Sequence, residues 1–368
     1  MPTPTFGVKY IGSKNKLLDH ILKLIESVVD DTPHPSIIDV FTGTTRVAQS
    51  FRAAGWRTTT CDLAWAARDY AALFLQTTPA DLPKLRELAK TLDDLPVDPD
   101  ATGWLESKYS DAPPAIDGGS PVRVWQPHNA KKADTIRDQI DVWKVSARIT
   151  QLMAQRLTTL LILALDSVDN TVGVQQAYLK QWCTRSHNTF NLASRIPPDD
   201  WAGWAGPTGH HICGDALTAK FPRVDVAYMD PPYTTHSYAT YYHIWDSISE
   251  WDKPEVMLKT NRRVDRVASH EARDLAMISP WNGRRAALAA FERMIRHLPA
   301  DKIVISYSSD AIIPLKALLN TIEKMDVCKG LSVHSVDHTR NVMALIGNGA
   351  DAANRSTVTE HLIVVRKA

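Results

Sequence analysis

The strongest constraint on the fold comes from the run Val224-Asp225-Val226-Ala227-Tyr228-Met229-Asp230-Pro231-Pro232-Tyr233. Apolar residues alternate with small or polar ones in its first half, a pattern that predicts a β-strand. The strand must end at Asp230, because Pro231 and Pro232 have no backbone N–H to donate to a neighbouring strand. A carboxylate and an aromatic ring are therefore expected at the carboxyl edge of a sheet, where open α/β sheets bind ligands.

These last four residues suit the methylation of an amine that is conjugated to an aromatic ring. Such an amine is a poor nucleophile, because its lone pair is delocalised into the ring. If the Asp230 carboxylate and the Pro231 carbonyl accept its two N–H groups, electron density returns to the nitrogen, while Tyr233 can stack on the ring. Asp-Pro-Pro is also a common turn sequence, so the motif alone could mark an ordinary turn. The strand directly before it favours the catalytic interpretation.

A strand-turn-helix pattern occupies residues 37–51. A short apolar strand runs into the turn Phe41-Thr42-Gly43-Thr44-Thr45, and a helix with an apolar face follows. Gly43 lets a ligand approach the backbone closely, and the start of the helix offers free N–H groups to a carboxylate or phosphate. The turn does not match Gly-x-Gly-x-x-Gly, so the dinucleotide fingerprint is absent.

A second strand, at residues 57–61, ends in Asp62, about twenty residues after Gly43. An acid at this spacing suits the hydroxyl pair of a ribose, so the turn and the acid together indicate an adenosine-containing ligand. The alternative is two strand-helix units with an incidental aspartate. Upstream, Tyr10-Ile11-Gly12-Ser13-Lys14 forms a basic loop before an amphipathic helix at 17–28; alone, it reads as a basic helix start.

Composition sets outer limits on the function. Of the 368 residues, 44% are hydrophobic and 23% are charged, which is ordinary for a globular protein. The net charge of +1 means that a polyanionic partner needs a local basic face. The four cysteines are scattered and no apolar run is long enough to span a bilayer, so we expect reduced thiols and a cytoplasmic protein.

The middle of the chain differs from the two ends. Residues 76–205 contain Pro-, Asp- and Gly-rich segments, several tryptophans, and helical patterns at 131–145 and 149–168. We expect this region to be an insertion, mainly helical and loop, in a catalytic core formed by residues 1–75 and 206–368. A strand followed by Asp215 resumes the core at residue 211. The C-terminal part predicts strands at 303–307, 342–346 and 362–365, with a helix near 312–319.

The region after the tetrad Asp230-Pro231-Pro232-Tyr233 is rich in aromatic and basic residues. Tyr238, Tyr241 and Tyr242 belong to an aromatic cluster that suits stacking on unpaired nucleotides. A basic stretch follows and is a candidate for contacts with phosphates. Its members are Lys259, Arg262, Arg263, Arg266, Arg273, Arg284 and Arg285.

Together these stretches resemble the site-specific DNA adenine-N(6) methyltransferases of the alpha (Dam-like) order, whose cofactor motif precedes a target-recognition region and whose catalytic tetrad comes last. The resemblance covers most of the chain, and Asp230-Pro231-Pro232-Tyr233 is its most specific motif. It implies an α/β fold: a Rossmann-like methyltransferase sheet that binds S-adenosylmethionine, with the helical target-recognition region inserted at 76–205. Within that region, Arg185, His187 and Asn188 are candidates for contacts with base edges.

The resemblance also assigns roles to individual residues. Catalysis falls on the tetrad, Asp230, Pro231, Pro232 and Tyr233. DNA contacts are expected at Tyr238, Arg262, Arg263, Arg266, Arg185 and Asn188. Contacts with S-adenosylmethionine fall on Tyr10, Lys14, Asp39, Phe41, Gly43, Thr44, Asp62, Asp215 and Asp230. Thr45 departs from the family pattern, which usually has a second glycine there, although a threonine is acceptable at a helix start.

The expected function is methyl transfer to the N(6) amine of an adenine flipped out of double-stranded DNA, at a cost of a few kcal/mol for flipping. No metal is expected, and a partner restriction enzyme is an open question. Cytosine-N(4) methylation is the nearest alternative, although serine is more usual there in place of Asp230. RNA or protein-glutamine methylation, a catalytically silent DNA-binding subunit and a nucleotide-binding dehydrogenase rank lower.

Overall fold

The structure is a computed structural model that describes residues 3–30, 32–112, 121–175, 177–234, 237–257, 261–267, 271, 278–339 and 357–368. Within these residues, the main sheet has seven strands in the order β5-β2-β1-β6-β7-β9-β8. In chain order they are β1 (Ser36–Val40), β2 (Arg57–Asp62), β5 (His210–Cys213), β6 (Val226–Met229), β7 (Lys302–Ser308), β8 (Cys328–Thr339) and β9 (Thr357–Lys367).

Five neighbouring strands of this sheet, β5 to β7, run parallel. The last two are reversed in turn: β9 pairs antiparallel with β7, and β8 antiparallel with β9. Because parallel strands end at one edge, the residues that follow β1, β2 and β6 are brought close together. This topology confirms the expected α/β methyltransferase sheet, and β6 ends before Asp230 as the two prolines require.

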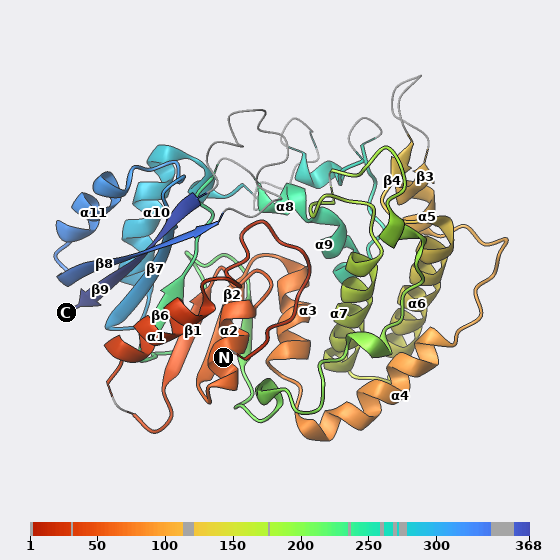
Figure 1. Cartoon of the computed structure of the whole chain (residues 1–368), viewed down its shortest axis with the longest axis horizontal. Helices are drawn as coiled ribbons and strands as arrows, with labels where there is room; N and C mark the ends of the chain where they lie inside the picture. The colour runs from red at the N-terminus through yellow and green to blue at the C-terminus, as the bar shows by residue number, and fades with distance from the viewer. Residues whose placement is uncertain are drawn as a thin grey trace.

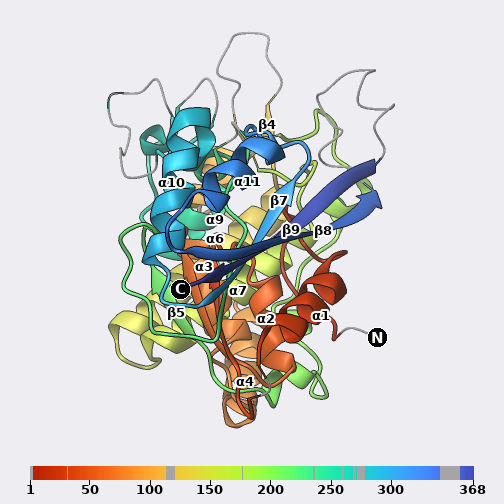
Figure 2. The same ribbon diagram turned by 90° about the vertical axis from the view of Figure 1, so that its left-hand side faces the viewer.

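Both faces of the central strands β1, β6 and β7 are buried, which explains why these strands are largely apolar. On one face, Ile37 and Val226 pack with α1 (Leu18–Val28) and α2 (Arg46–Ala53). On the other, Ile38 and Ala227 pack with α10 (Arg284–His297) and α11 (Leu315–Glu323). Figure 2 shows the strands between these two pairs of helices. Successive residues of one strand therefore enter different cores, as the two-residue period of a strand requires.

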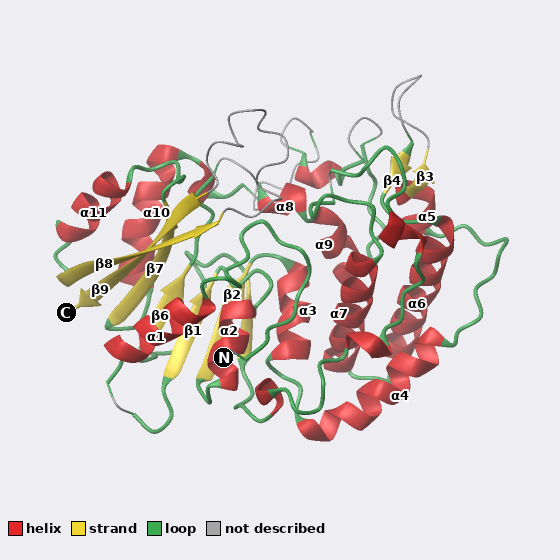
Figure 3. Ribbon diagram, in the orientation of Figure 1, coloured by secondary structure: helices red, strands yellow, loops and turns green. Residues whose placement is uncertain are grey.

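A helical region adjoins the sheet. It contains α4 (Leu82–Asp93), α5 (Trp104–Tyr109), α6 (Pro127–Val145) and α7 (Gln151–Ser167), with a small hairpin of β3 (Ser110–Ala112) and β4 (Val122–Arg123). These helices share one hydrophobic core with α3 (Trp65–Phe74) and α9 (His243–Glu250). In Figure 1, α3 and α9 lie between the sheet and α6 and α7. Figure 3 shows the same division, with the strands of the main sheet at the left and α4, α6 and α7 at the right.

The structure agrees with most of the expected elements. The helical patterns at 131–145 and 149–168 are confirmed as α6 and α7, and the C-terminal strand at 362–365 lies within β9. The strand expected at 342–346 lies outside the described residues. The edge strand β8 was not expected, because its side chains are mostly exposed and polar. Within the described ranges, no helix combines the length and apolar character needed to cross a membrane.

Candidate active site

The turn after β1 lies at the carboxyl edge of the sheet. Phe41, Gly43 and Thr45 all have positive φ angles, of 65°, 50° and 61°. At Gly43 a Cβ atom would lie 3.2 Å from the hydroxyl oxygen of Tyr10 and 3.3 Å from two of its ring carbons. Gly43 is therefore needed both for the left-handed backbone and for the close approach of Tyr10.

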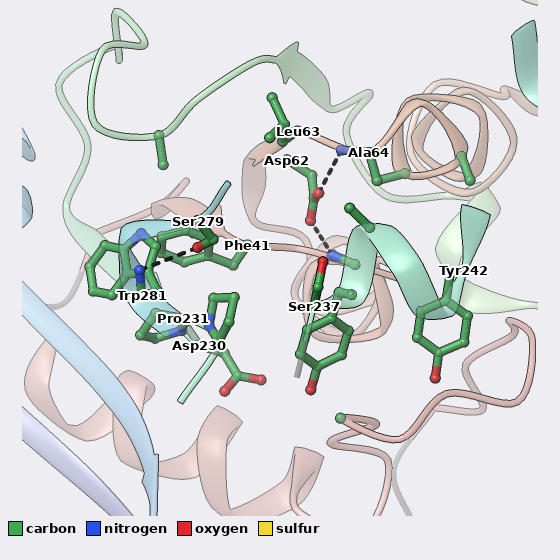
Figure 4. Close-up of a pocket in the computed structure, with 18 of the residues that line it drawn as sticks. Phe41, Asp62, Leu63, Ala64, Asp230, Pro231, Ser237, Tyr242, Ser279 and Trp281 are labelled. Atoms are coloured by element: carbon green, nitrogen blue, oxygen red, sulfur yellow. Dashed lines mark hydrogen bonds between the residues drawn. The ribbon is translucent and has the colours of Figure 1, made fainter. Parts of the chain in front are cut away.

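Asp62, the last residue of β2, closes this turn. Its Oδ2 accepts a hydrogen bond from the backbone N–H of Gly43 at 2.8 Å, and its Oδ1 accepts one from Ala64 at 2.9 Å (Figure 4). Burial raises the pKa of Asp62 above its ordinary value, while these backbone bonds act in the opposite direction. The carboxylate is thereby fixed in orientation, with an edge on the pocket.

Three tyrosine rings form one wall of the pocket. The Tyr10 ring stacks on Tyr242 with 4.6 Å between centroids and lies 5.4 Å from Tyr238. The Tyr242 hydroxyl also accepts a hydrogen bond from the backbone N–H of Ile11 at 2.9 Å. The loop that carries Tyr10 is thus attached to the start of α9, which follows α8 (Tyr238–Tyr241). On the opposite side in Figure 4, Phe41 lies edge-on to Trp281, 5.0 Å between centroids.

Asp230 and Tyr233 meet Lys14 at the far end of the pocket. The Lys14 ammonium nitrogen lies 3.0 Å from Asp230 Oδ1 and 3.1 Å from the Tyr233 hydroxyl. It also lies 3.0 Å from Oε1 of Glu360, a buried residue of β9. Burial raises the pKa of the Asp230 carboxyl, against the Lys14 ammonium, which lowers it. Two carboxylates therefore share one buried cation beside the tetrad.

One pocket brings together most of the residues that the sequence singled out. Those that line it are Tyr10, Phe41, Gly43, Thr44, Asp62, Asp215, Asp230, Pro231, Pro232, Tyr233 and Tyr238. Figure 4 shows Asp62 and Asp230 at opposite ends of this space. Asp215 is exposed at the rim, where its Oδ1 accepts the Leu217 N–H at 3.0 Å. Tyr238, for which a DNA contact is predicted, is part of the tyrosine wall.

Two of the expected cofactor residues lie outside the pocket lining. Asp39 is only 2% exposed, and its Oδ2 accepts hydrogen bonds from Thr42 Oγ1 at 2.7 Å and the Ala48 N–H at 3.2 Å. Burial raises the pKa of Asp39 to about 7. Asp39 therefore holds the turn in shape from below. Lys14 supports the tetrad through Asp230 and Tyr233.

Sequence reasoning missed two acidic residues. Glu360 could have been noticed as the acid two residues before the apolar run 362–365 of β9. Asp246 lines the pocket from α9, and its Oδ1 accepts the backbone N–H of Ala66 at 3.1 Å. Burial raises the pKa of Asp246 to about 6. No sequence signal distinguished Asp246 from an ordinary surface helix residue.

The structure corrects the assignment of Arg263 and Arg266 to DNA phosphates. Arg263 is 3% exposed and pairs with Asp252 at 2.6 Å and Asp265 at 3.0 Å. Arg266 is 4% exposed, lies 3.4 Å from Asp265 and stacks over the ring of Trp65. Both guanidinium groups are buried and interact with other residues of the protein, so neither is available to bind a polyanion.

The other expected DNA contacts have mixed surroundings. Arg185 is 39% exposed in its side chain, but it donates to Asp169 Oδ1 at 2.8 Å and to the Thr171 carbonyl at 2.5 Å. Arg185 therefore stabilises the loop between Asp169 and its own position. Asn188 is exposed, and Arg262 is partly buried. Lys259 and Arg273 lie outside the described residues.

The pocket residues fit S-adenosylmethionine. Asp62 offers a fixed carboxylate to a hydroxyl pair, and the close approach of Gly43 and Tyr10 leaves a narrow, aromatic-walled space. Thr44, two residues before α2, also lines this space. In the part of the chain that the structure describes, no cluster of three or more His, Cys, Asp or Glu residues could hold a metal ion.

Comparison with known proteins places this geometry in a family. Residues 10–280 match the D12 class N6 adenine-specific DNA methyltransferases. Modification methylase StsI of Streptococcus sanguinis is 27% identical over 327 residues, which cover 87% of this chain and 47% of that protein. Modification methylase LlaI of Lactococcus lactis subsp. lactis is 26% identical over 338 residues, 87% of this chain and 49% of that protein.

A third relative is nearer in length. Type II methyltransferase M.NlaIII of Neisseria lactamica is 24% identical over 320 residues, which cover 86% of this chain and 88% of that protein. This chain thus spans about half the length of the first two relatives and most of the third. The family match covers more than half of the chain and includes Tyr10, Asp62 and the tetrad. The chain therefore belongs to the D12 class N6 adenine-specific DNA methyltransferase family.

Proposed function

We propose that this protein transfers a methyl group from S-adenosylmethionine to the N(6) amine of adenine in double-stranded DNA, at a specific site. One observation carries the proposal: Asp230, Pro231 and Tyr233 line the same pocket as the ribose-type acid Asp62. A methyl donor held at Asp62 and an amine held at the tetrad would share one space. Family membership supports adenine as the target and DNA as the substrate.

The residues of the chain supply binding and positioning. S-adenosylmethionine contributes the methyl group, activated on a positively charged sulfur. The Asp230 carboxylate and the Pro231 carbonyl accept the two N–H groups of the target amine, and the Tyr233 ring stacks on the base. The adenine must first leave the duplex, because these acceptors lie at the end of an enclosed pocket; flipping costs a few kcal/mol, offset by stacking and hydrogen bonds.

The proposal extends to the setting of the reaction. Residues 76–205 form the target-recognition region, with the exposed Asn188 among its candidates for base contact, and residues 1–75 and 206–368 form the catalytic core. The relatives named modification methylases support a restriction-modification context with a partner restriction enzyme. The scattered cysteines support the cytoplasm as the place of action.

Nucleoside mass spectrometry tests the proposal directly. Plasmid DNA is incubated with the protein and S-adenosylmethionine labelled in its methyl group, then digested to nucleosides. Label is expected in N(6)-methyldeoxyadenosine. Label in N(4)-methylcytosine would favour the cytosine alternative, and no label, with DNA binding intact, would favour a silent DNA-binding subunit.

Asp230→Ala is the matched variant for this experiment. Loss of the acceptor aimed at the amine should lower methyl transfer by about 10²–10⁴-fold. Thermal unfolding of the same preparation shows whether the variant is folded. Near-normal turnover in Asp230→Ala would place the reaction elsewhere.

A further inference from the structure

The Lys14 ammonium has three acceptors within hydrogen-bond distance. They are Asp230 Oδ1 at 3.0 Å, Glu360 Oε1 at 3.0 Å and the Tyr233 hydroxyl at 3.1 Å. An ammonium group has three N–H donors and no acceptor. Lys14 donates hydrogen bonds to Glu360 and Tyr233 and forms an ion pair with Asp230. The lysine side chain is 6% exposed, which leaves little access for water. Lys14 therefore has a fixed position relative to both carboxylates.

Glu360 lies in a strand of the sheet, whereas Lys14 and Asp230 lie in loops. It lies in β9, whose antiparallel register with β7 sets Glu360 opposite Ser308. Its Oε1 also accepts a hydrogen bond from Ser306 Oγ, on the neighbouring strand. Glu360 is 2% exposed. A buried carboxylate is costly unless it is paired and hydrogen-bonded, and Lys14 and Ser306 meet both needs.

We propose that Glu360 is a positioning residue for methyl transfer, which shares the Lys14 ammonium with Asp230 and so leaves Asp230 enough negative charge to accept the N–H of the target amine. This inference rests on the proposed function of the pocket. With one cation between two carboxylates, neither is neutralised completely. Without the Glu360 charge, Lys14 would pair with Asp230 alone, and the target amine would compete with a full ion pair. The negative charge of Glu360 also raises the pKa of Asp230, which makes the ionised Asp230 carboxylate a stronger hydrogen-bond acceptor.

The test uses three substitutions that separate charge from shape. Glu360→Gln keeps an oxygen that can accept from Lys14 and Ser306 but removes the charge. Glu360→Asp keeps the charge and withdraws it by one methylene. Ser306→Ala, the matched control, removes one hydrogen bond and leaves the Glu360 charge in place. Thermal unfolding of each variant confirms that it is folded.

The first readout is the pH profile of kcat with saturating DNA and S-adenosylmethionine. The two carboxylate oxygens are each 3.0 Å from one nitrogen, so they lie close enough for removal of one charge to shift the other group by about one pH unit. For Glu360→Gln, the acid limb should move to lower pH by that amount, and kcat on the plateau should fall about tenfold. Glu360→Asp and Ser306→Ala should keep the acid limb near that of the wild type.

The second readout does not depend on turnover. Carbon-13 NMR of aspartate labelled at the side-chain carboxyl follows the titration of Asp230, assigned by its loss in Asp230→Asn. Its midpoint should be lower in Glu360→Gln than in wild type, by about one unit. The inference would be overturned by an unchanged Asp230 midpoint in Glu360→Gln, or by a fall in its kcat with no shift of the acid limb. Either result would mean that Glu360 only stabilises the fold. A wild-type protein that methylates nothing defeats the proposed function instead, and the NMR titration still decides the role of Glu360.

Discussion

Substitution of Gly43 by alanine should weaken cofactor binding out of proportion to its effect on stability. Gly43 has φ +50°, and a Cβ there would lie 3.2–3.3 Å from the hydroxyl oxygen and two ring carbons of Tyr10. Gly55, just after α2, has φ +88°, and a Cβ there would meet nothing within 4 Å. Both substitutions strain the backbone, but only Gly43→Ala also presses on a pocket wall. Gly55→Ala is therefore a matched control for backbone strain.

The magnitudes follow from the backbone and from the Tyr10 contact. An L-residue in the left-handed region costs about 1–2 kcal/mol, and this should be the main effect of Gly55→Ala on the free energy of unfolding. In Gly43→Ala, the Tyr10 ring cannot simply withdraw, because Tyr242 stacks behind it at 4.6 Å. The turn relieves the strain by leaving its conformation, which also disturbs the bond from the Gly43 N–H to Asp62. Binding must then restore the turn, so about 1–2 kcal/mol should appear as a 5–30-fold weaker affinity.

Calorimetry with S-adenosylhomocysteine, without DNA, measures this affinity, and urea unfolding measures the stability of each variant. The expected result is a 5–30-fold loss of affinity in Gly43→Ala and an unchanged affinity in Gly55→Ala. Equal affinities in the two variants would refute the argument that the turn and Tyr10 shape the cofactor site. A loss of the same size in Gly55→Ala would show that strain anywhere in this region is sufficient.

Two further predictions concern buried basic groups. Arg263→Ala should lower the free energy of unfolding by up to about 3 kcal/mol. The loss should stay below that of a fully buried ion pair, because the two aspartate partners of Arg263 remain in contact with solvent. The salt dependence of DNA binding should not change. A slope smaller by about 0.9 would instead show a phosphate contact. His243 is 1% exposed, and burial, together with nearby arginines, lowers its pKa to about 3. The unfolded chain therefore binds a proton at His243 at a higher pH than the folded chain does. The contribution of neutral His243 to the free energy of unfolding is complete above about pH 6.5 and is lost as the pH falls toward 3. From pH 8 to pH 5 the wild type should therefore lose about 2 kcal/mol more unfolding free energy than His243→Gln in urea titrations; parallel losses would contradict this sign.

Local backbone chemistry made the central part of the site predictable. Two prolines after Asp230 end β6 whatever packs around it, and Gly43 marks a turn in any context. The central strands β1 and β6 could be placed because both of their faces are buried, so their apolar runs are nearly continuous. Parallel strands then bring Asp62 and the tetrad to one edge without any knowledge of distant contacts.

Charge partners could not be predicted in the same way. Arg263 and Arg266 lie in a basic stretch, which favoured an exposed phosphate-binding face. Their burial depends on Asp252, Asp265 and the ring of Trp65, which comes from a helix far away in the sequence. Glu360 was missed for the related reason that its cationic partner, Lys14, lies at the opposite end of the chain. A density of like charge along the sequence does not indicate how each charge is neutralised in three dimensions.

Thr45 shows how a residue can be acceptable for a reason other than the expected one. The sequence indicated that a threonine is acceptable at a helix start, where this residue type is common. Thr45 does precede α2, but it has φ 61° and its side chain makes no cap hydrogen bond. Its Oγ1 accepts instead from Gln49 Nε2 at 3.1 Å, and Gln49 bonds both the N–H and the carbonyl of Phe6, at 2.8 and 2.9 Å. Where a glycine would adopt this backbone freely, threonine adopts it under strain and in return joins the turn to the N-terminal segment that carries Tyr10.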